Sequence, residues 1–343
     1  IYTNAYHLRM PTRLCSVGKM YPINIKSAAK KHKARHILTQ NIVNKGDIIY
    51  DRIPLLFNND VIIYKSHVNK SMESFYRNAH FDELLYIQSG SGALSTNFGE
   101  LKIKKGDYIV IPSGVIWKLL INNDLQILII ESSTAIETPK KYRNEFGQLL
   151  EHSPFCERDI RTPDLVAPIN KTGEFKVNVR TNKGLQEMFY SHHPFDVVGW
   201  DGYYFPWVFN INDFEPITGS LHQPPPVHQN FQSEGFVICS FVNRMFDYHK
   251  DAIPAPYPHS NVDSDEVIFY SEGNFMSRKG ISLESITYHP MGLPHGPQPG
   301  KYEASIGKKW TDELAVMVDT FKPLNLTQNA INLEDNKYSL SWL

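Results

Sequence analysis

Short apolar runs, each bounded by glycine, proline or asparagine, recur along most of the chain. The clearest runs, which we expect to form strands, lie at 48–50, 61–64, 84–87, 108–111, 127–130, 236–241 and 267–270. Short strands with frequent turn signals predict an all-β sandwich or barrel. Long amphipathic helical patterns are scarce, and only Gly184–Tyr190 could form a short helix.

An imperfect repeat relates the two halves of the chain. Glu83 opens the stretch ELLYIQSG and Glu266 opens EVIFYSEG, so each glutamate is followed after six residues by glycine. Further on, each half has P-x-G-x-x, which ends in Trp117 in the early copy and in His295 in the late copy. These paired motifs resemble those of the cupin superfamily, whose small double-sheet barrels place metal ligands on neighbouring strands.

The cupin resemblance implies a fold class and a domain organisation. We expect an all-β bicupin with two double-sheet β-sandwich or jelly-roll barrels and few short helices. The first barrel is expected within residues 1–192 and the second within residues 193–343.

The late copy of the repeat contains a candidate metal site. His259 lies seven residues before Glu266, where a cupin has its first histidine, and His295 ends the second motif. Asn261 stands where the other histidine would be. Two imidazoles and one carboxylate on one face of an octahedral ion leave three positions open, as in non-haem Fe(II) oxygenases.

The glutamate of this set has an acidic neighbour that could be mistaken for the ligand. The E-x6-G spacing favours Glu266 over Asp265. Because side chains alternate along a strand, Ile268 and Tyr270 are expected on the same face as Glu266. A buried carboxylate in an otherwise apolar row needs a partner, since an isolated buried charge is very costly.

The early copy of the repeat lacks the imidazoles of a metal site. Tyr76 and Asn78 stand at its two upstream ligand positions, and Trp117 stands at the last one. A single carboxylate, Glu83, is a poor site for a transition metal. We therefore expect the N-terminal barrel to be structural and free of metal.

Composition narrows the class of protein. Hydrophobic residues make up 41% and charged residues 21% of the 343 residues, and the net charge is −1, so nothing favours a nucleic acid or a membrane as partner. The three cysteines are few and widely spaced, which fits a reducing, cytoplasmic setting. No apolar run reaches the roughly 18 residues that a membrane span needs.

Three stretches in the C-terminal half resemble the iron site of homogentisate 1,2-dioxygenases: PHSNVDSDE, EVIFYSEGNF and SITYHPMGLPHGPQPG. The likeness extends upstream through PFDVVGWDGYYFPWVFNINDF and FGELKIKKGDYIVIPSGV. It implies Fe(II) bound by His259, Glu266 and His295, and ring opening of a small aromatic substrate with O2 in aromatic or tyrosine catabolism. It also implies that His289 lies beside the iron as a catalytic candidate.

The substrate side departs from that family. Asp201 stands where the family has an acid/base histidine, and Phe275 stands where it has a substrate-contacting tyrosine. We keep Asp201 as a catalytic candidate and expect a dihydroxylated aromatic other than homogentisate to be preferred. Tyr203 and His228 are further substrate-binding candidates, and His222 near the proline run could line the pocket mouth.

Two alternatives remain open. One is a cupin enzyme that uses another metal, such as a manganese- or zinc-dependent isomerase or hydrolase. The other is a non-catalytic cupin that binds a ligand. In each case we expect a homo-oligomer.

Overall fold

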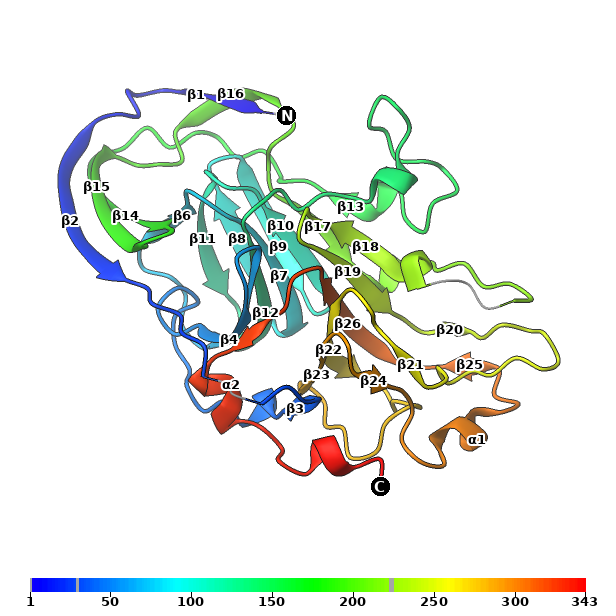
Figure 1. The fold of residues 1–343 in the computed structure, drawn as a ribbon. Coiled ribbons are helices and arrows are strands. Elements are labelled where there is room, and N and C mark those ends of the chain that lie inside the picture. Colours follow the sequence, from blue (N-terminus) through cyan, green and yellow to red (C-terminus); the bar gives the residue numbers. More distant parts are fainter. Residues whose placement is uncertain (1, 29–30, 222–224) are drawn as a thin grey trace.

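Three large sheets, stacked as layers, form most of the molecule (Figure 1). The computed structural model describes residues 2–28, 31–221 and 225–343. The eight-stranded sheet has the order β13 (Ile160–Arg161), β17 (Trp207–Asn210), β10 (Asp107–Ile111), β7 (Asp82–Ser89), β12 (Leu125–Ser132), β5 (Val61–Val68), β4 (Ile53–Phe57) and β27 (Asn325–Leu326). The seven-stranded sheet has the order β2 (Leu14–Pro22), β15 (Gly184–His192), β14 (Thr172–Thr181), β6 (Phe75–Asn78), β11 (Ile116–Ile121), β8 (Ser91–Thr96) and β9 (Gly99–Lys104).

The third sheet and three short ribbons complete the strands. The six-stranded sheet has the order β18 (Gln229–Gln232), β19 (Phe236–Phe241), β26 (Leu314–Thr320), β22 (Asp265–Glu272), β23 (Ile286–His289) and β3 (Arg35–Ile37). The ribbons pair β1 (Thr3–His7) with β16 (Val197–Gly202), β20 (Arg244–Met245) with β25 (Trp310–Thr311), and β21 (His259–Ser260) with β24 (Pro294–His295). Strand pairing is antiparallel except between β14 and β6.

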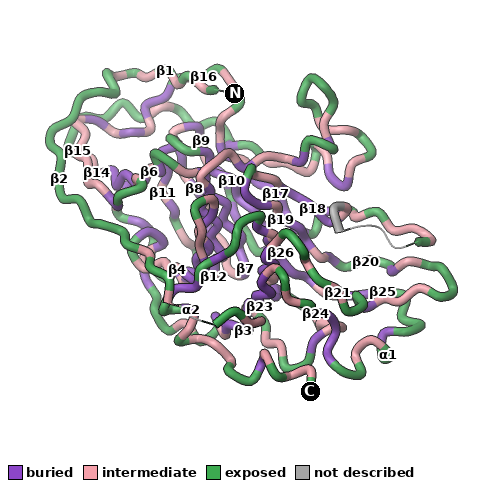
Figure 2. The backbone as a smooth tube through the Cα atoms, in the orientation of Figure 1, coloured by how far each residue is buried: buried purple, intermediate pink, exposed green. Residues whose placement is uncertain are grey.

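The eight-stranded sheet is the middle layer, and its central strands are buried on both faces. On β7, Leu85 and Ile87 belong to the core shared with the seven-stranded sheet. Leu84 and Tyr86 belong to the core shared with the six-stranded sheet. Burial on both faces explains why these strands are continuous apolar runs without polar alternation. Figure 2 shows the buried centre, and β2 as an exposed strand at the periphery.

The predicted all-β class with few short helices is confirmed. The described residues contain two α-helices, α1 (Lys301–Ser305) and α2 (Gln328–Asn332), and 3-10 turns at 39–41, 140–142, 157–159, 211–213, 225–228 and 338–340. None of the described helices is long and apolar enough to cross a membrane.

Two local predictions were wrong. Residues 48–50 form a turn before β4 instead of a strand, where the Asp47 carboxylate accepts the backbone N–H of Ile49. Gly184–Tyr190 belongs to strand β15, because it pairs with β14 on one side and β2 on the other. Long-range strand pairing therefore outweighs a weak local helical preference there.

The seven- and eight-stranded sheets form the N-terminal barrel, and the six-stranded sheet with the ribbons β20–β25 and β21–β24 forms the C-terminal barrel. These two barrels exchange strands. Near the N-terminus, β3 pairs with β23 and forms the edge of the six-stranded sheet. Near the C-terminus, β27 pairs with β4 and forms the edge of the eight-stranded sheet. Strands β16 and β17 follow the predicted domain boundary at residues 192 and 193, yet they pair with β1 and β10. The barrels are thus interleaved along the sequence.

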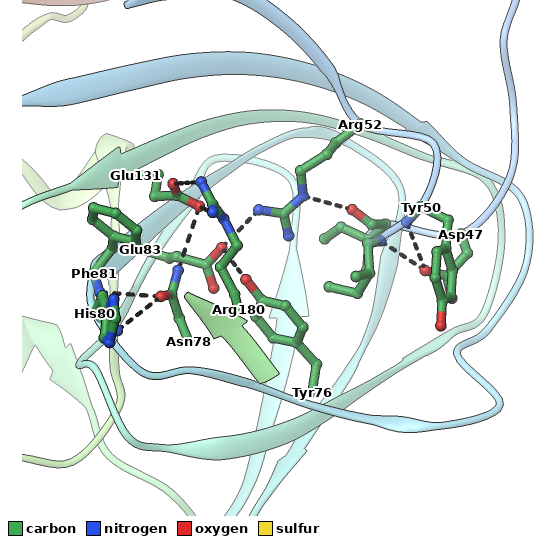
Figure 3. A network of polar contacts seen from close by, with 12 residues as sticks. Asp47, Tyr50, Arg52, Tyr76, Asn78, His80, Phe81, Glu83, Glu131 and Arg180 are labelled. Atoms are coloured by element: carbon green, nitrogen blue, oxygen red, sulfur yellow. Dashed lines mark hydrogen bonds and ion pairs between the residues drawn. The ribbon is translucent and has the colours of Figure 1, made fainter. Parts of the chain in front are cut away.

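The centre of the N-terminal barrel contains a buried ionic network (Figure 3). The Arg52 guanidinium donates from Nη1 to Oε1 of Glu83 at 2.7 Å, and the Tyr76 hydroxyl donates to the same oxygen at 3.2 Å. The guanidinium also lies 5.5 Å from the ring centroid of Tyr64 and 5.6 Å from that of Tyr76. Trp117 is fully buried beside Tyr76, with ring centroids 5.0 Å apart.

A second acid lies next to Glu83 in this network. Glu131 on β12 is the cross-strand partner of Glu83 on β7. Arg180 binds the Glu131 carboxylate with two hydrogen bonds, of 2.7 and 3.2 Å. Burial raises the pKa of Glu131, an effect that Arg180 opposes and Glu83 increases. Two guanidinium groups therefore balance two adjacent buried carboxylates.

The Arg52–Glu83 pair gives a prediction about stability. Arg52→Ala leaves Glu83 buried without its countercharge, so the free energy of unfolding should fall by about 3–5 kcal/mol. Lys105→Ala is the matched control, because Lys105 and Glu272 form a pair with 53% and 54% of their side chains exposed. Such an exposed pair contributes about 0–1 kcal/mol. Chemical denaturation of both variants measures the difference, and equal losses would contradict the assigned role of Arg52.

Candidate metal centre

Three neighbouring strands bring the predicted ligands together. His259 on β21 and His295 on β24 are direct cross-strand partners, with ring centroids 4.3 Å apart. Glu266 lies on β22, and the three ligand atoms lie within 4.8 Å of one another. Donors that each lie about 2.0–2.2 Å from a shared ion are at most about 4.4 Å apart, so small side-chain shifts would bring these atoms onto one ion. Among the described residues, this is the one group of at least three potential ligands.

A glycine permits the close approach of the two histidine strands. A Cβ atom on Gly296 would lie 2.7 Å from the Cα atom of Pro258. Such a contact with backbone would push the strands apart. Gly296 therefore keeps His295 next to His259.

The donor atoms of the two histidines fit a metal ion. The carbonyl oxygen of Tyr257 lies 2.8 Å from Nδ1 of His259. If Nδ1 carries the proton, Nε2 is left as a ligand, the common arrangement of metal-binding histidines. His295 is buried, and neither of its ring nitrogens has a hydrogen-bond partner among the described residues. Its Nε2 lies 3.5 Å from Oε2 of Glu266. A buried imidazole that makes no geometric hydrogen bond and lies 3.5 Å from a carboxylate suits an ion between the two groups.

Glu266 is held by a fourth residue, His289. The two residues are cross-strand partners, and Nδ1 of His289 lies 2.7 Å from Oε1 of Glu266. Burial lowers the pKa of His289 to about 4, although Glu266 acts in the opposite direction. Burial would raise the pKa of Glu266, but the contacts with His289 and His295 lower it well below its usual value. The pair is therefore a carboxylate with a neutral imidazole.

The alternation predicted for β22 agrees with the structure. Val267 and Phe269 point into the core between the barrels, so Glu266 lies on the opposite face. Asp265 is fully buried and accepts hydrogen bonds from the Tyr288 hydroxyl and two backbone N–H groups. Asp265 therefore has a structural role, and Glu266 is the carboxylate that joins the histidines.

Sequence reasoning missed a second acid beside the centre. Asp319 on β26 is the cross-strand partner of Glu266, as Glu131 is of Glu83 in the other barrel. Its Oδ1 is buried without a hydrogen-bond partner among the described residues. Burial, with Glu266 and Asp263, raises the pKa of Asp319 to about 8. The available signal was an acid after an apolar run in each repeat, ILIIE and AVMVD.

Two predicted substrate residues lie within the C-terminal barrel. The ring of Phe275 packs against Tyr270, with centroids 4.4 Å apart, and Tyr270 is on the same strand as Glu266. His228 is nearly buried and lies 5.2 Å from the ring of Phe241. Of these two, Phe275 packs against the strand of the triad, whereas His228 contacts β19.

The remaining predicted residues are not brought to the triad. Asp201 lies on the exposed ribbon β1–β16, where its carboxylate accepts hydrogen bonds from the Tyr6 hydroxyl at 2.9 Å and the Asn4 N–H at 3.3 Å. Tyr203 follows this ribbon and is 84% exposed. Figure 1 shows β16 at the opposite end of the molecule from β21 and β24. His222 lies outside the described residues.

Comparisons with known proteins extend the picture from the site to the whole chain. The sequence model of one protein family, homogentisate 1,2-dioxygenase N-terminal, matches residues 51–211. A protein of Saccharolobus solfataricus that carries a provisional dioxygenase name is 43% identical over 99% of this chain and 89% of its own length.

More distant relatives have an established family name. The homogentisate 1,2-dioxygenase of Bradyrhizobium diazoefficiens is 27% identical over 80% of this chain, and the match covers 64% of that enzyme. The corresponding match to the Legionella pneumophila enzyme covers 66% of its length, so the chain spans about two thirds of these relatives. A solved cupin 2 conserved barrel domain protein from Leptotrichia buccalis is 12% identical, with a TM-score of 0.38 over 88% of this chain and 100% of that chain. On the evidence of these sequence matches, the chain belongs to the homogentisate 1,2-dioxygenase family.

Proposed function

We propose that this protein is an Fe(II)-dependent dioxygenase that opens a dihydroxylated aromatic ring with O2. The observation that carries the proposal is the set of His259, Glu266 and His295, whose ligand atoms converge within 4.8 Å. Two imidazoles and one carboxylate form the ligand set of non-haem Fe(II) oxygenases. The homogentisate 1,2-dioxygenase activity named for the distant relatives supports the choice of reaction.

The residues around the triad have distinct tasks in this proposal. A ferrous ion in such a site supplies open coordination positions and the electron transfer that O2 chemistry requires. Glu266 and His295 are buried, whereas His259 is partly exposed, so substrate would enter on the side of His259. Both ring nitrogens of His289 contact protein groups, Glu266 and Tyr338. His289 would have to give up one of these contacts to move a substrate proton.

The substrate proposed here carries no carboxylate near the metal. Phe275, next to Tyr270, offers no hydroxyl donor to a substrate carboxylate. The lack of this donor favours a neutral dihydroxylated ring over homogentisate.

Oxygen uptake tests the reaction directly. The protein is loaded anaerobically with Fe(II) and mixed with hydroquinone, catechol, gentisate or homogentisate in an oxygen electrode. We expect uptake to require Fe(II) and to stop with a chelator, and neutral rings to react faster. Full activity with Zn(II) would exclude the proposed redox chemistry, because Zn(II) cannot pass electrons to O2.

Metal content gives a second prediction. The wild type should bind one iron per chain, and His295→Ala should lose most of it because one ligand is removed. His67→Ala is the matched control, since His67 lies on β5 with its Nε2 3.3 Å from the exposed Asp124 carboxylate and is not one of the three candidate ligands. Elemental analysis of the purified proteins measures the ratio. Two ions per chain in the wild type would contradict a structural N-terminal barrel.

Asp201 gives a third prediction. Asp201→Asn should leave kcat/KM within about twofold of the wild type, because an exposed side chain without contact to the reacting groups contributes little to transition-state stabilisation. Steady-state oxygen uptake with the best ring substrate measures the effect. A loss of a hundredfold or more would restore Asp201 as a catalytic candidate.

A further inference from the structure

Tyr338, in the C-terminal part of the chain, contacts His289 of the candidate metal centre. Tyr338, in the 3-10 turn Tyr338–Leu340, is 2% exposed. Its hydroxyl oxygen lies 2.9 Å from Nε2 of His289. The other nitrogen of His289, Nδ1, lies 2.7 Å from Oε1 of Glu266. A chain of two hydrogen bonds therefore connects Tyr338 to the carboxylate of the triad.

The direction of these hydrogen bonds follows from the groups involved. An ionised carboxylate only accepts, so Nδ1 of His289 carries the proton that is donated to Glu266. In a neutral imidazole the other nitrogen is then an acceptor, and the Tyr338 hydroxyl donates to it. The His289 ring also stacks on the His295 ring, with centroids 4.5 Å apart and planes 7° apart. His289 thus contacts two of the three ligands at once.

The segment that supplies Tyr338 is fixed on several sides. The Tyr338 ring packs against His36, with centroids 5.4 Å apart, and against Trp342 at 5.2 Å. Trp342 donates from Nε1 to the carbonyl oxygen of Gly296 at 3.3 Å, directly after His295. Gln298 donates to the Ser341 hydroxyl at 2.6 Å. Residues 338–342, which we name the C-terminal clasp, therefore join the loop that follows the last ligand.

We propose that Tyr338 is a positioning residue of the metal centre, which orients Glu266 through His289 and couples metal binding to docking of the C-terminal clasp. The inference rests on the proposed metal site and goes beyond it. Groups that hydrogen-bond to metal ligands fix their orientation, and their loss typically weakens metal affinity by about 10–100-fold. Because binding linkage is reciprocal, a bound ion should in turn hold the clasp in place.

The first test measures Co(II) affinity in the full chain. A site with nitrogen and oxygen ligands binds Co(II) more tightly than Fe(II). The visible absorption of bound Co(II) reports the coordination geometry of the site. Tyr338→Phe keeps the packed ring and removes only the hydroxyl. We expect its Co(II) affinity, measured against a competing chelator, to fall by about 10–100-fold. The absorption bands should also shift, because Glu266 is freer to rotate.

The control is Tyr108→Phe. Tyr108 is also buried, and its hydroxyl lies 2.7 Å from the Ser240 hydroxyl, a contact that involves neither the triad nor His289. Its Co(II) affinity and spectrum should match the wild type. Unfolding midpoints of both variants, measured with chelator present, separate a general loss of stability from a loss at the site.

The second test uses the reciprocal effect. Hydrogen–deuterium exchange of the backbone amides of residues 338–342 should be slower in the Co(II)-loaded than in the metal-free wild type. In Tyr338→Phe, Co(II) at saturating concentration should protect the clasp less. His295→Ala should show no metal-dependent protection.

The outcomes separate the two proposals. If the wild type binds Co(II) and Tyr338→Phe binds it with the same affinity and spectrum, the positioning role is wrong and the metal site stands. If the wild type binds no more Co(II) than His295→Ala, the metal site itself fails, and the positioning role fails with it. If Tyr338→Phe and Tyr108→Phe lose affinity equally, Tyr338 is a structural residue only.

Discussion

A carboxylate buried in the centre of each barrel must have a positive or hydrogen-bonding partner, and much of this structure follows from that requirement. The free-energy cost of burying a charge without a partner exceeds the net folding stability of a typical domain. In the N-terminal barrel, Arg52 and Tyr76 both donate to Oε1 of Glu83, whereas its Oε2 is buried without a hydrogen-bond partner among the described residues. In the C-terminal barrel, His289 and two candidate metal ligands surround Glu266. The motif glutamate is therefore paired with a guanidinium in the N-terminal barrel, whereas in the C-terminal barrel it lies among residues that could hold a metal ion.

The second acid of each barrel shows the same divergence. Glu131 and Asp319 occupy matching cross-strand positions beside the motif glutamates. Arg180 neutralises Glu131 with two hydrogen bonds. Asp319 keeps a buried oxygen without a partner among the described residues. In the N-terminal barrel each of the two adjacent acids forms an ion pair with an arginine, whereas Oδ1 of Asp319 has no partner among the described residues.

The sequence predicted the parts of the site whose spacing is local. His259, Glu266 and His295 lie on strands that the two motifs define, so motif spacing was sufficient to bring them together. Arg52 and Tyr338 could not be found in this way, because each reaches its partner through tertiary packing outside the motifs.

A role expected from sequence resemblance alone does not ensure that the residue lies near the site. Asp201 occupies a matching place in the sequence, but in the described structure its ribbon lies far from the triad. Sequence position does not determine which end of a barrel a ribbon covers. The all-β class was easier to predict, because apolar runs and turn residues carry that signal along the whole chain.

The exchanged edge strands have a consequence for how the chain reaches its fold during synthesis. Ile37 on β3 pairs with Ile286, and Leu56 on β4 pairs with Leu326, so neither pairing can form until most of the polypeptide has emerged. Until then β4 presents an open sheet edge, the kind of surface that recruits other chains. Contacts of such long sequence separation also slow folding. The N-terminal barrel, which is translated first, therefore acquires its edge strand β27 only after most of the C-terminal barrel has been made, and a chain whose synthesis stops before β27 would have an unprotected edge.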